Sequence, residues 1–358
     1  MVMKAVGVWQ ALPTDAPRAL VDHDIPAPTP GPDDLLVRVE AVAVNPADAR
    51  VRMRKADDGA FQILGWDVAG TVAGLGSDVT GFAPGDPVFY AGDLTRPGGN
   101  AELHVVDAAL VARRPASLPP AAAAAIPLTA LTVWEALFER LALPEPDMDV
   151  APVGRTLLIV GGAGGVGSMA IQVARLVPGL RVIATASREA SQAWCLSLGA
   201  EAVIDHSADM LSEMEARGLP APELVLLASG PDGHFPALAA MIAPQGRICC
   251  IVPFDTPPDI NLLMQKSASL SWEFMFTRSM FATSDRTRQG RILGKVAALI
   301  DAGRMTPPAP HELGPINARN LLEAHRRIEG KRTIGKMVLA EFRTSDQRPI
   351  HTDERTLP

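Results

Sequence analysis

The sequence is poor in cysteine. Only Cys195, Cys249 and Cys250 occur among its 358 residues, and an odd, small number argues against a framework of disulfide bonds. Cys249 and Cys250 are neighbours in a strand-like run, where successive side chains point to opposite faces of a sheet. The two thiols therefore cannot easily share a metal ion, and we interpret all three cysteines as small buried hydrophobic residues.

The chain also lacks the marks of nucleic-acid-binding, secreted and membrane proteins. Its net charge is −7, and it contains no dense basic cluster that would attract nucleic acid. The N-terminus has no basic stretch followed by an apolar one, as a signal peptide has. The longest apolar run, 118–134, is rich in alanine and carries three prolines, a poor composition for a membrane span. We therefore expect a cytoplasmic protein that binds neither nucleic acid nor a membrane.

The sequence does contain two stretches of different patterning, and its length suggests about two domains. Residues 1–120 carry short strand-like runs separated by turn signals such as PGPDD and APGD, which predicts a compact, mostly β unit. From Arg155 onward, continuous apolar strands alternate with helix-like segments. This alternation predicts an α/β unit with a doubly wound parallel sheet that helices cover on both faces.

A glycine-rich segment joins a predicted strand to a predicted helix. Five of the eight residues 161–168 are glycine, between TLLIV and SMAIQVARLV. Their spacing fits G-x-G-x-x-G, in which the first glycine allows a tight turn, the second lets a pyrophosphate approach the backbone, and the third lets helix and sheet pack closely. The N-terminus of the helix offers unpaired N–H groups to the phosphates. The predicted dinucleotide-binding residues are Gly162, Gly164, Gly165, Val166 and Gly167.

The end of the next strand predicts which dinucleotide binds. An NAD site usually has an acidic residue about 20 residues past the glycine loop, but Ala186 stands nineteen residues after Gly167. Ser187 and Arg188 follow, a hydroxyl and a cation that suit a 2′-phosphate. We therefore predict NADPH rather than NADH. The alternative is that Arg188 is a solvated residue at the start of a helix.

Several motifs in this order resemble the medium-chain dehydrogenase/reductase superfamily: NPADARVR (45–52), GWDVAGTVAGLG (65–76), LTALTVWEALFERL (128–141), GGAGGVGSMAIQVAR (161–175) and GKMVL (335–339). Within it, the chain is similar to quinone oxidoreductases and to zinc-type alcohol dehydrogenase-like proteins. The resemblance implies a GroES-like catalytic domain (1–127 and 305–345), a Rossmann domain (128–304) and a polar tail (346–358). It also implies an active site in the cleft between the domains, and a homodimer.

The zinc ligands of related alcohol dehydrogenases are missing at the matching positions. Those enzymes use a cysteine, a histidine and a second cysteine, where this chain has Asn45, Trp66 and, near the third position, Leu128. The four cysteines of a structural zinc loop are also absent from residues 90–103. An amide and an indole do not build a zinc site, so we predict a protein without zinc.

The remaining candidate residues follow from this resemblance and from their chemistry. Asn45 is the candidate catalytic residue, since its amide can donate to an acceptor oxygen or orient a nicotinamide ring; the alternative is that it fixes the turn before Pro46. Trp66 and Tyr90 are predicted to form flat apolar walls of the substrate pocket, or else to be core aromatics. The resemblance implies that Thr132 lies near the nicotinamide and that Lys336 lies near the cofactor in the cleft.

We predict from these observations a zinc-free, NADPH-dependent oxidoreductase. Its substrate would be a quinone or an α,β-unsaturated carbonyl, because the conjugation of such an acceptor spreads the charge of an incoming hydride. Two alternatives stay open at this point. One is an NADPH-binding sensor or partner-binding protein with little turnover, and the other is an enzyme of the alcohol or aldehyde dehydrogenase type. An aromatic segment, 272–281, would cover the nicotinamide, form a dimer edge or simply pack as a helix.

Overall fold

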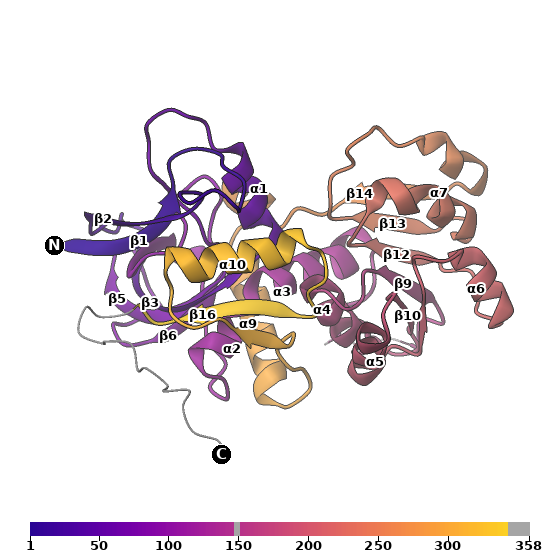
Figure 1. Cartoon of the computed structure of the whole chain (residues 1–358). Helices are drawn as coiled ribbons and strands as arrows, with labels where there is room; N and C mark the ends of the chain where they lie inside the picture. Colours follow the sequence, from indigo (N-terminus) through magenta and orange to yellow (C-terminus); the bar gives the residue numbers. More distant parts are fainter. Residues whose placement is uncertain (147–150, 343–358) are drawn as a thin grey trace, which may run out of the picture.

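The structure, a computed structural model, describes residues 1–146 and 151–342. The predicted polar tail, 346–358, lies outside the described residues. Two units lie side by side along the long direction of the molecule, the first mostly β and the second α/β (Figure 1). The predicted α/β fold class, with a GroES-like unit and a Rossmann unit, is confirmed.

The first unit is built from two sheets. The larger sheet has the order β15-β16-β3-β5-β6-β8, with β7 paired to β3, and the smaller has the order β2-β1-β4. Hydrophobic residues alternate along β3 (Asp34–Val44), which buries one face of the strand in the core. The other strands are β1 (Val2–Val8), β2 (Val21–Pro26), β4 (Gln62–Ile63), β5 (Val68–Leu75), β6 (Pro87–Tyr90), β7 (Leu103–Asp107), β8 (Ala112–Arg113), β15 (Pro310–Glu312) and β16 (Lys336–Ala340).

The C-terminal part of the described chain returns to this first unit. Strand β16 pairs antiparallel with β3, with Met337 opposite Val44. Helix α1 (Pro46–Arg54) begins directly after β3, and α10 (Ala318–Glu329) packs against α1. The pairing places the first residue of β16 beside the last residues of β3, and this juxtaposition builds one wall of the site described below.

The second unit is a six-stranded parallel sheet with the order β11-β10-β9-β12-β13-β14. Its central strands are apolar and fully buried, as expected for a parallel sheet with helices on both faces. The strand order reverses between β10 and β12 on either side of β9, which is where open α/β sheets bind ligands. The strands are β9 (Thr156–Val160), β10 (Arg181–Thr185), β11 (Ala202–Ile204), β12 (Leu224–Leu227), β13 (Arg247–Cys250) and β14 (Ser269–Trp272).

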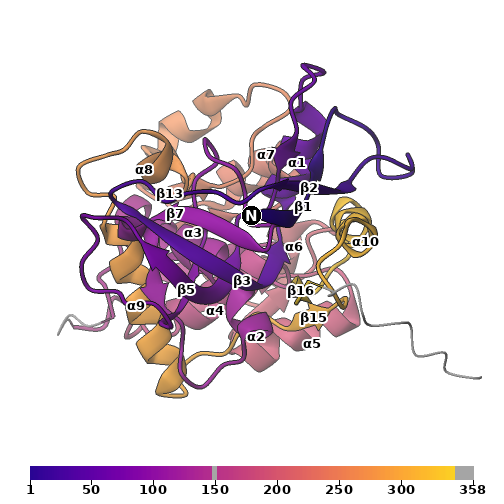
Figure 2. The same cartoon turned by 90° about the vertical axis from the view of Figure 1, so that its left-hand side faces the viewer.

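Helices cover the parallel sheet and fill the junction between the units. Those of the second unit are α4 (Gly165–Ala174), α5 (Glu189–Leu198), α6 (Met210–Ala216), α7 (Pro231–Met241), η3 (Ile260–Lys266) and α8 (Thr277–Met280), and a short turn, η1 (Ala108–Leu110), belongs to the first. At the junction lie α2 (Pro120–Ala124), α3 (Pro127–Trp134), η2 (Glu135–Arg140) and α9 (Arg288–Asp301). Helix α9 packs against α3 (Figure 2), and it also packs against η1 and β8 of the first unit.

One helical stretch of the described chain is long and apolar enough to cross a membrane. It is Pro120–Arg140, which combines α2, α3 and η2, and 89% of its most apolar window is buried inside the fold. Its apolar side chains therefore pack against protein on nearly all sides, which is the position of a core helix.

Candidate active site

The glycine loop connects β9 to α4, as its sequence predicts, but the turn begins one glycine earlier. The left-handed backbone conformation falls on Gly161, whose φ is +86°. Gly162 instead lies close to β10 and α5, because a Cβ atom on it would be 2.8 Å from the Cβ of Ala184 and 2.9 Å from the Sγ of Cys195. This glycine therefore serves a close approach of backbone to side chains rather than the turn itself.

The other two motif glycines differ from each other in what surrounds them. A Cβ atom on Gly167 would lie 2.2 Å from the carbonyl oxygen of Gly161, so this glycine lets α4 pack closely against the loop. A Cβ on Gly164 would meet only that same oxygen, at 3.7 Å. The Cβ direction of Gly164 thus points into open space at the start of α4, where N–H groups and the helix dipole favour an anion.

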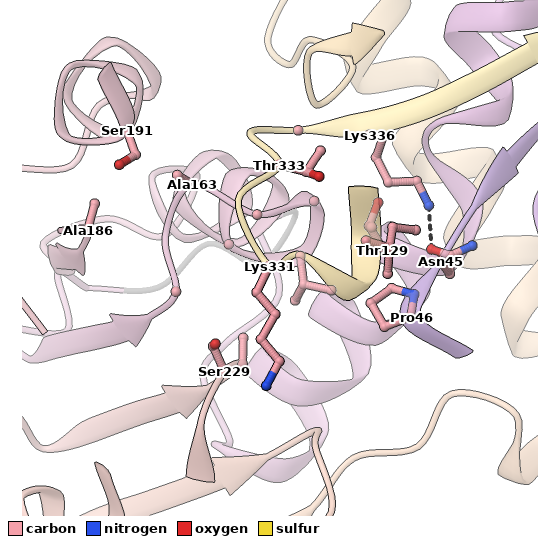
Figure 3. A pocket seen from close by; sticks show the side chains of 18 of the residues that line it. Asn45, Pro46, Thr129, Ala163, Ala186, Ser191, Ser229, Lys331, Thr333 and Lys336 are labelled. Atoms are coloured by element: carbon pink, nitrogen blue, oxygen red, sulfur yellow. Dashed lines mark hydrogen bonds between the residues drawn. The ribbon is translucent and has the colours of Figure 1, made fainter. Parts of the chain in front are cut away.

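This open space is a cavity of about 300 Å³ between the two units (Figure 3). The glycine loop and the end of β10 form one side, and Asn45, Pro46 and Lys336 of the first unit form the other. Most of the predicted site residues line it together: Asn45, Gly164, Gly165, Val166, Gly167, Ser187, Arg188 and Lys336. Sequence reasoning missed further lining residues, among them Thr129, His206 and Lys331.

The part of the cavity beyond β10 is cationic. Arg188 stands at the N-terminus of α5, and its Nη2 donates a hydrogen bond to the carbonyl oxygen of Arg332 at 2.8 Å. Lys331 extends into the cavity from the segment between α10 and β16 (Figure 3). Among the described residues that line the cavity there is no Asp or Glu. The chain as a whole is acidic, so this distribution gives the cavity a charge opposite to that of the molecule.

Three buried polar residues meet at the inner end of the cavity. Asn45 follows β3, Asp67 precedes β5 and Lys336 begins β16, and each side chain is at most a few per cent exposed. The Asn45 amide nitrogen donates to Oδ2 of Asp67 at 2.9 Å. The Lys336 ammonium donates to the same carboxylate at 2.7 Å. It also donates to Oδ1 of Asn45 (Figure 3). We call Asn45, Asp67 and Lys336 the polar triplet.

The geometry separates the two predicted roles of Asn45. Its backbone N–H donates to the carboxylate of Asp48 at 2.7 Å, and this bond stabilises the first turn of α1. Its side-chain amide bonds to Asp67 and Lys336 instead. The turn before Pro46 therefore depends on the backbone of Asn45 and on Asp48, which leaves the amide for the polar triplet.

Burial shapes the electrostatics of the two carboxyl groups near Asn45. It raises the pKa of Asp67, against the opposing effects of Lys336 and Asn45. Asp67 also accepts a hydrogen bond from the backbone N–H of Leu128 at 2.7 Å, at the start of α3. Burial likewise raises the pKa of Asp48 to about 6. Sequence reasoning did not assign Asp67 a role, although it follows Trp66 in the segment compared with the zinc ligands.

The donor set does not fit a zinc ion. Zinc sites in proteins use thiolate, imidazole and carboxylate ligands in a tetrahedral arrangement, whereas Asn45 offers an amide oxygen that already accepts a bond from Lys336. The Lys336 ammonium, itself a cation, already forms an ion pair with the carboxylate of Asp67. In the ranges 1–146 and 151–342, no group of three or more His, Cys, Asp or Glu side chains could hold a metal ion.

Four of the predicted residues do not line the cavity: Gly162, whose surroundings are described above, and Trp66, Tyr90 and Thr132. Trp66 is 1% exposed and donates from Nε1 to the carbonyl oxygen of Asp93 at 3.0 Å. Tyr90 is fully buried, with its hydroxyl 2.9 Å from Nδ1 of His104. Thr132 donates to the carbonyl oxygen of Leu128 at 2.8 Å, within α3. Each side chain has its polar partner inside the core, so none forms an open wall; Thr129, one helical turn before Thr132, lines the cavity instead.

Comparison with known proteins agrees with this architecture. The model of the alcohol dehydrogenase GroES-like domain matches residues 31–116, and that of the zinc-binding dehydrogenase family matches residues 165–287. A zinc-type alcohol dehydrogenase-like protein of Staphylococcus aureus is 35% identical over 337 residues, 94% of this chain and 99% of that protein. A 2-methylene-furan-3-one reductase of Solanum lycopersicum is 27% identical over 330 residues, 89% of this chain and 74% of that protein.

Solved structures share the fold over nearly the whole chain. A candidate zinc-dependent alcohol dehydrogenase of Rhizobium etli CFN 42 is 46% identical with a TM-score of 0.91, over 96% of this chain and 99% of that one. A mycobacterial protein solved in complex with NADPH is 27% identical with a TM-score of 0.76, over 94% of this chain and 99% of that one. The glycine loop, the two-unit architecture and these relatives lead to one conclusion: the chain is a member of the medium-chain dehydrogenase/reductase superfamily of oxidoreductases, in its quinone oxidoreductase and alcohol dehydrogenase-like group.

Proposed function

We propose that this protein is an NADPH-dependent reductase of quinones or α,β-unsaturated carbonyl compounds and that it works without zinc. The observation that carries the proposal is the polar triplet, in which a lysine ammonium stands at the inner end of the cofactor cavity. The mycobacterial relative solved with NADPH and the furanone reductase of tomato support the choice of cofactor and of acceptor class.

The cationic part of the cavity supports NADPH over NADH. Arg188 and Lys331 approach it from the two units, and the hydroxyl of Ser187 lies beside them in the lining. A 2′-phosphate is recognised by such cations and hydroxyl groups, whereas a free 2′-hydroxyl is usually bonded by a carboxylate. The residues of the glycine loop would hold the pyrophosphate, because the space in front of Gly164 is open and the N-terminus of α4 points at it.

The polar triplet supplies what a carbonyl acceptor needs. An ammonium has three N–H donors, and Lys336 uses two of them on Asn45 and Asp67. The third can donate to a carbonyl oxygen in the cavity, stabilise the negative charge that develops there, and later transfer its proton to the product. Asp67 stabilises the charged lysine, and Asn45 fixes the position of its Nζ. NADPH, when bound, supplies the hydride for the acceptor carbon.

The proposal is tested by following NADPH and NADH oxidation against a panel of quinones, enones, saturated aldehydes and ketones, with the metal content measured on the same samples. We expect oxidation of NADPH with quinones or enones, little activity with saturated carbonyls, and no dependence on bound zinc. Tight NADPH binding without oxidation by any acceptor would favour a sensor or partner-binding protein. Activity with saturated aldehydes that requires stoichiometric zinc would favour an alcohol dehydrogenase.

We also propose a homodimer, formed through the outer edge of the parallel sheet. Strand β14 ends the described sheet with one neighbour, β13. Four large hydrophobic side chains at or after this strand are substantially exposed: Trp272, Phe274, Met280 and Phe281. An open strand edge beside exposed aromatic residues is a surface that folded proteins usually cover. Light scattering of the purified chain should give twice the monomer mass of 37.8 kDa, and a monomeric mass at micromolar concentration would contradict this.

A further inference from the structure

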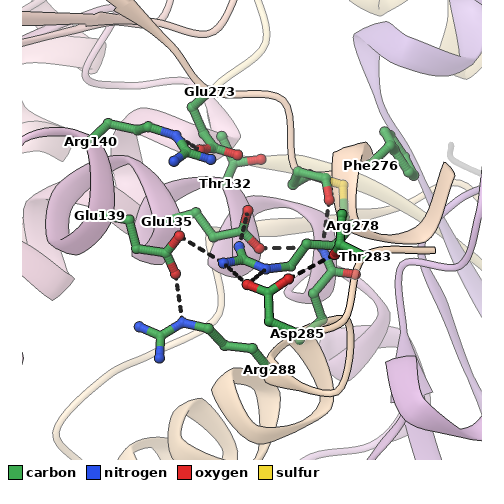
Figure 4. A network of polar contacts seen from close by, with 12 residues as sticks. Thr132, Glu135, Glu139, Arg140, Glu273, Phe276, Arg278, Thr283, Asp285 and Arg288 are labelled. Atoms are coloured by element: carbon green, nitrogen blue, oxygen red, sulfur yellow. Dashed lines mark hydrogen bonds and ion pairs between the residues drawn. The ribbon is translucent and has the colours of Figure 1, made fainter. Parts of the chain in front are cut away.

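A network of buried charges at the junction of the two units lies outside the polar triplet (Figure 4). Its centre contains two glutamates, Glu135 of η2 and Glu273 just after β14, which are 1% and 2% exposed. Arg278 Nη1 lies 2.7 Å from Oε2 of Glu135, and Arg140 Nε donates to Oε2 of Glu273 at 2.8 Å. Two carboxyl groups thus lie inside the protein in one network, close enough for each to shift the pKa of the other.

One oxygen of this pair has no N–H donor. Oε1 of Glu273 is fully buried and has no hydrogen-bond partner among the described residues, and the neighbouring carboxyl group of Glu135 is buried as well. Two neighbouring buried carboxylates, both ionised, would repel each other and leave a buried acceptor unsatisfied, which is costly at low dielectric. A single proton between them removes both problems, because a protonated carboxyl group donates a hydrogen bond to the other carboxylate.

We propose that Glu273 is held protonated at neutral pH and that its hydrogen bond to Glu135 fixes the segment 273–281 against the back of the catalytic site, which makes Glu273 a positioning residue. The segment reaches the site through Phe276, whose ring meets that of Trp66 edge-on at 6.5 Å between centroids. Trp66 precedes Asp67 of the polar triplet. The catalytic part of this inference rests on the proposed function, whereas the shared proton does not.

The charged groups around the pair set the pH range of this bond. Those that act on the pair are Glu139 and Arg140 of η2, Cys249 of β13 and Arg278 of α8. Asp285 and Arg288, from the turn before α9 and its start, pair in turn with Arg278 and Glu139. Burial, together with the charge of Glu135, raises the pKa of Glu273 from 4.5 to about 8, against the effect of Arg140. Because the folded pKa lies above the unfolded value, the proton stabilises the fold most at low pH, and this contribution is lost as the pH rises towards 8.

Glu273→Gln tests the proposal, because the amide keeps the shape of the protonated acid: its N–H can donate to Glu135 and its oxygen can accept from Arg140. The wild-type unfolding constant should rise by up to about tenfold per pH unit between pH 5 and 8 because of this one proton. The variant should lack this contribution. The ratio of the two unfolding constants should therefore shift in favour of the variant by about a thousandfold between pH 5 and pH 9.

A control separates this effect from the loss of an ion pair. Glu145 lies at the rim of the same network, paired with Arg288 and Lys295 at 2.7 Å each. Its pKa is lowered, since these bonds outweigh its burial. Glu145→Gln should therefore destabilise the protein at pH 9 at least as much as at pH 5. If Glu273→Gln behaves like this control, the proposal is wrong.

Infrared spectroscopy and kinetics complete the test. The wild type at pH 7 should show a carboxylic-acid C=O band that Glu273→Gln lacks, and its absence from the wild type would overturn the proposal. Glu135→Gln, in which the amide donates to an ionised Glu273, serves as the second variant if the first does not fold, and it should abolish the same band.

In turnover, kcat/KM of the wild type should fall above about pH 8, while kcat/KM of Glu273→Gln should not change with pH in this range. A missing band refutes the shared proton, whereas a band without any turnover refutes the proposed function alone.

Discussion

The contrast between Gly164 and Gly167 gives a sharp prediction about the glycine loop. The two residues lie three positions apart in the same motif, yet a Cβ on Gly167 would overlap the carbonyl oxygen of Gly161 at 2.2 Å, while a Cβ on Gly164 would have 3.7 Å to that atom. Gly164 has φ −70° and ψ 173°, a conformation that valine adopts readily. Gly164→Val should therefore keep the stability of the wild type, whereas Gly167→Ala should lose stability.

The expected losses of NADPH affinity and of stability follow from the contacts that each new side chain disrupts. A valine side chain at 164 occupies the space through which a pyrophosphate would reach the backbone, and losing one charge-assisted hydrogen bond costs about 1.5–3 kcal/mol, or roughly 10- to 150-fold in affinity. Overpacking at 167 should cost about 1–3 kcal/mol of stability, or more. Fluorescence titration with NADPH measures the affinity, and urea unfolding without ligand measures the stability. Unchanged NADPH affinity in a folded Gly164→Val protein would refute the assignment of the loop to the pyrophosphate.

Three further predictions concern single side chains. Arg188→Ala should weaken NADPH binding by about 10- to 150-fold, the loss of one charged hydrogen bond, and leave NADH almost unaffected in the same titration; equal losses would remove the 2′-phosphate assignment. Lys331→Met should raise the Kd for NADPH without lowering kcat at saturating NADPH, and a lower kcat would instead place Lys331 in the chemical step. Burial, with a contribution from Arg52, lowers the pKa of His325 to about 3, so the unfolded chain binds more protons between pH 6.5 and 3 and stability should fall by up to about 1.4 kcal/mol per pH unit on acidification. In His325→Leu the free energy of unfolding, measured with urea, should depend less on pH below 6.5. An unchanged pH dependence would show that His325 is not its source.

The glycine loop was predictable because its information is local. A strand, three spaced glycines and a helix follow one another within twenty residues, and Gly162 and Gly167 each have a steric reason to lack a side chain. Even here the sequence placed the turn at Gly162, whereas the positive φ lies on Gly161. Adjacent glycines are equally able to adopt a left-handed conformation, so only the packing against Ala184 and Cys195 decides between them.

The polar triplet was predictable only in part, because its members come from three separate segments. Lys336 lies 291 positions from Asn45 and 269 from Asp67, and only the return of β16 to β3 brings them together. The resemblance supplied Asn45 and Lys336, but nothing local marked Asp67. For Trp66 and Tyr90 the sequence left two roles open, pocket wall or core, since aromatic residues near an active site can equally fill the core when their polar atoms find partners there.

The central claim is that the Lys336 ammonium takes the place of a metal ion as the electrophile at the acceptor oxygen. The most direct measurement compares the wild type and Lys336→Met after exhaustive removal of metals, with kcat for an active quinone or enone and Kd for NADPH determined on the same samples. The account predicts that the metal-free wild type retains full activity, and that the variant loses about 10²- to 10³-fold in kcat while its Kd for NADPH changes little. A wild type that regains activity only when zinc is added, or a variant with undiminished kcat, would contradict it.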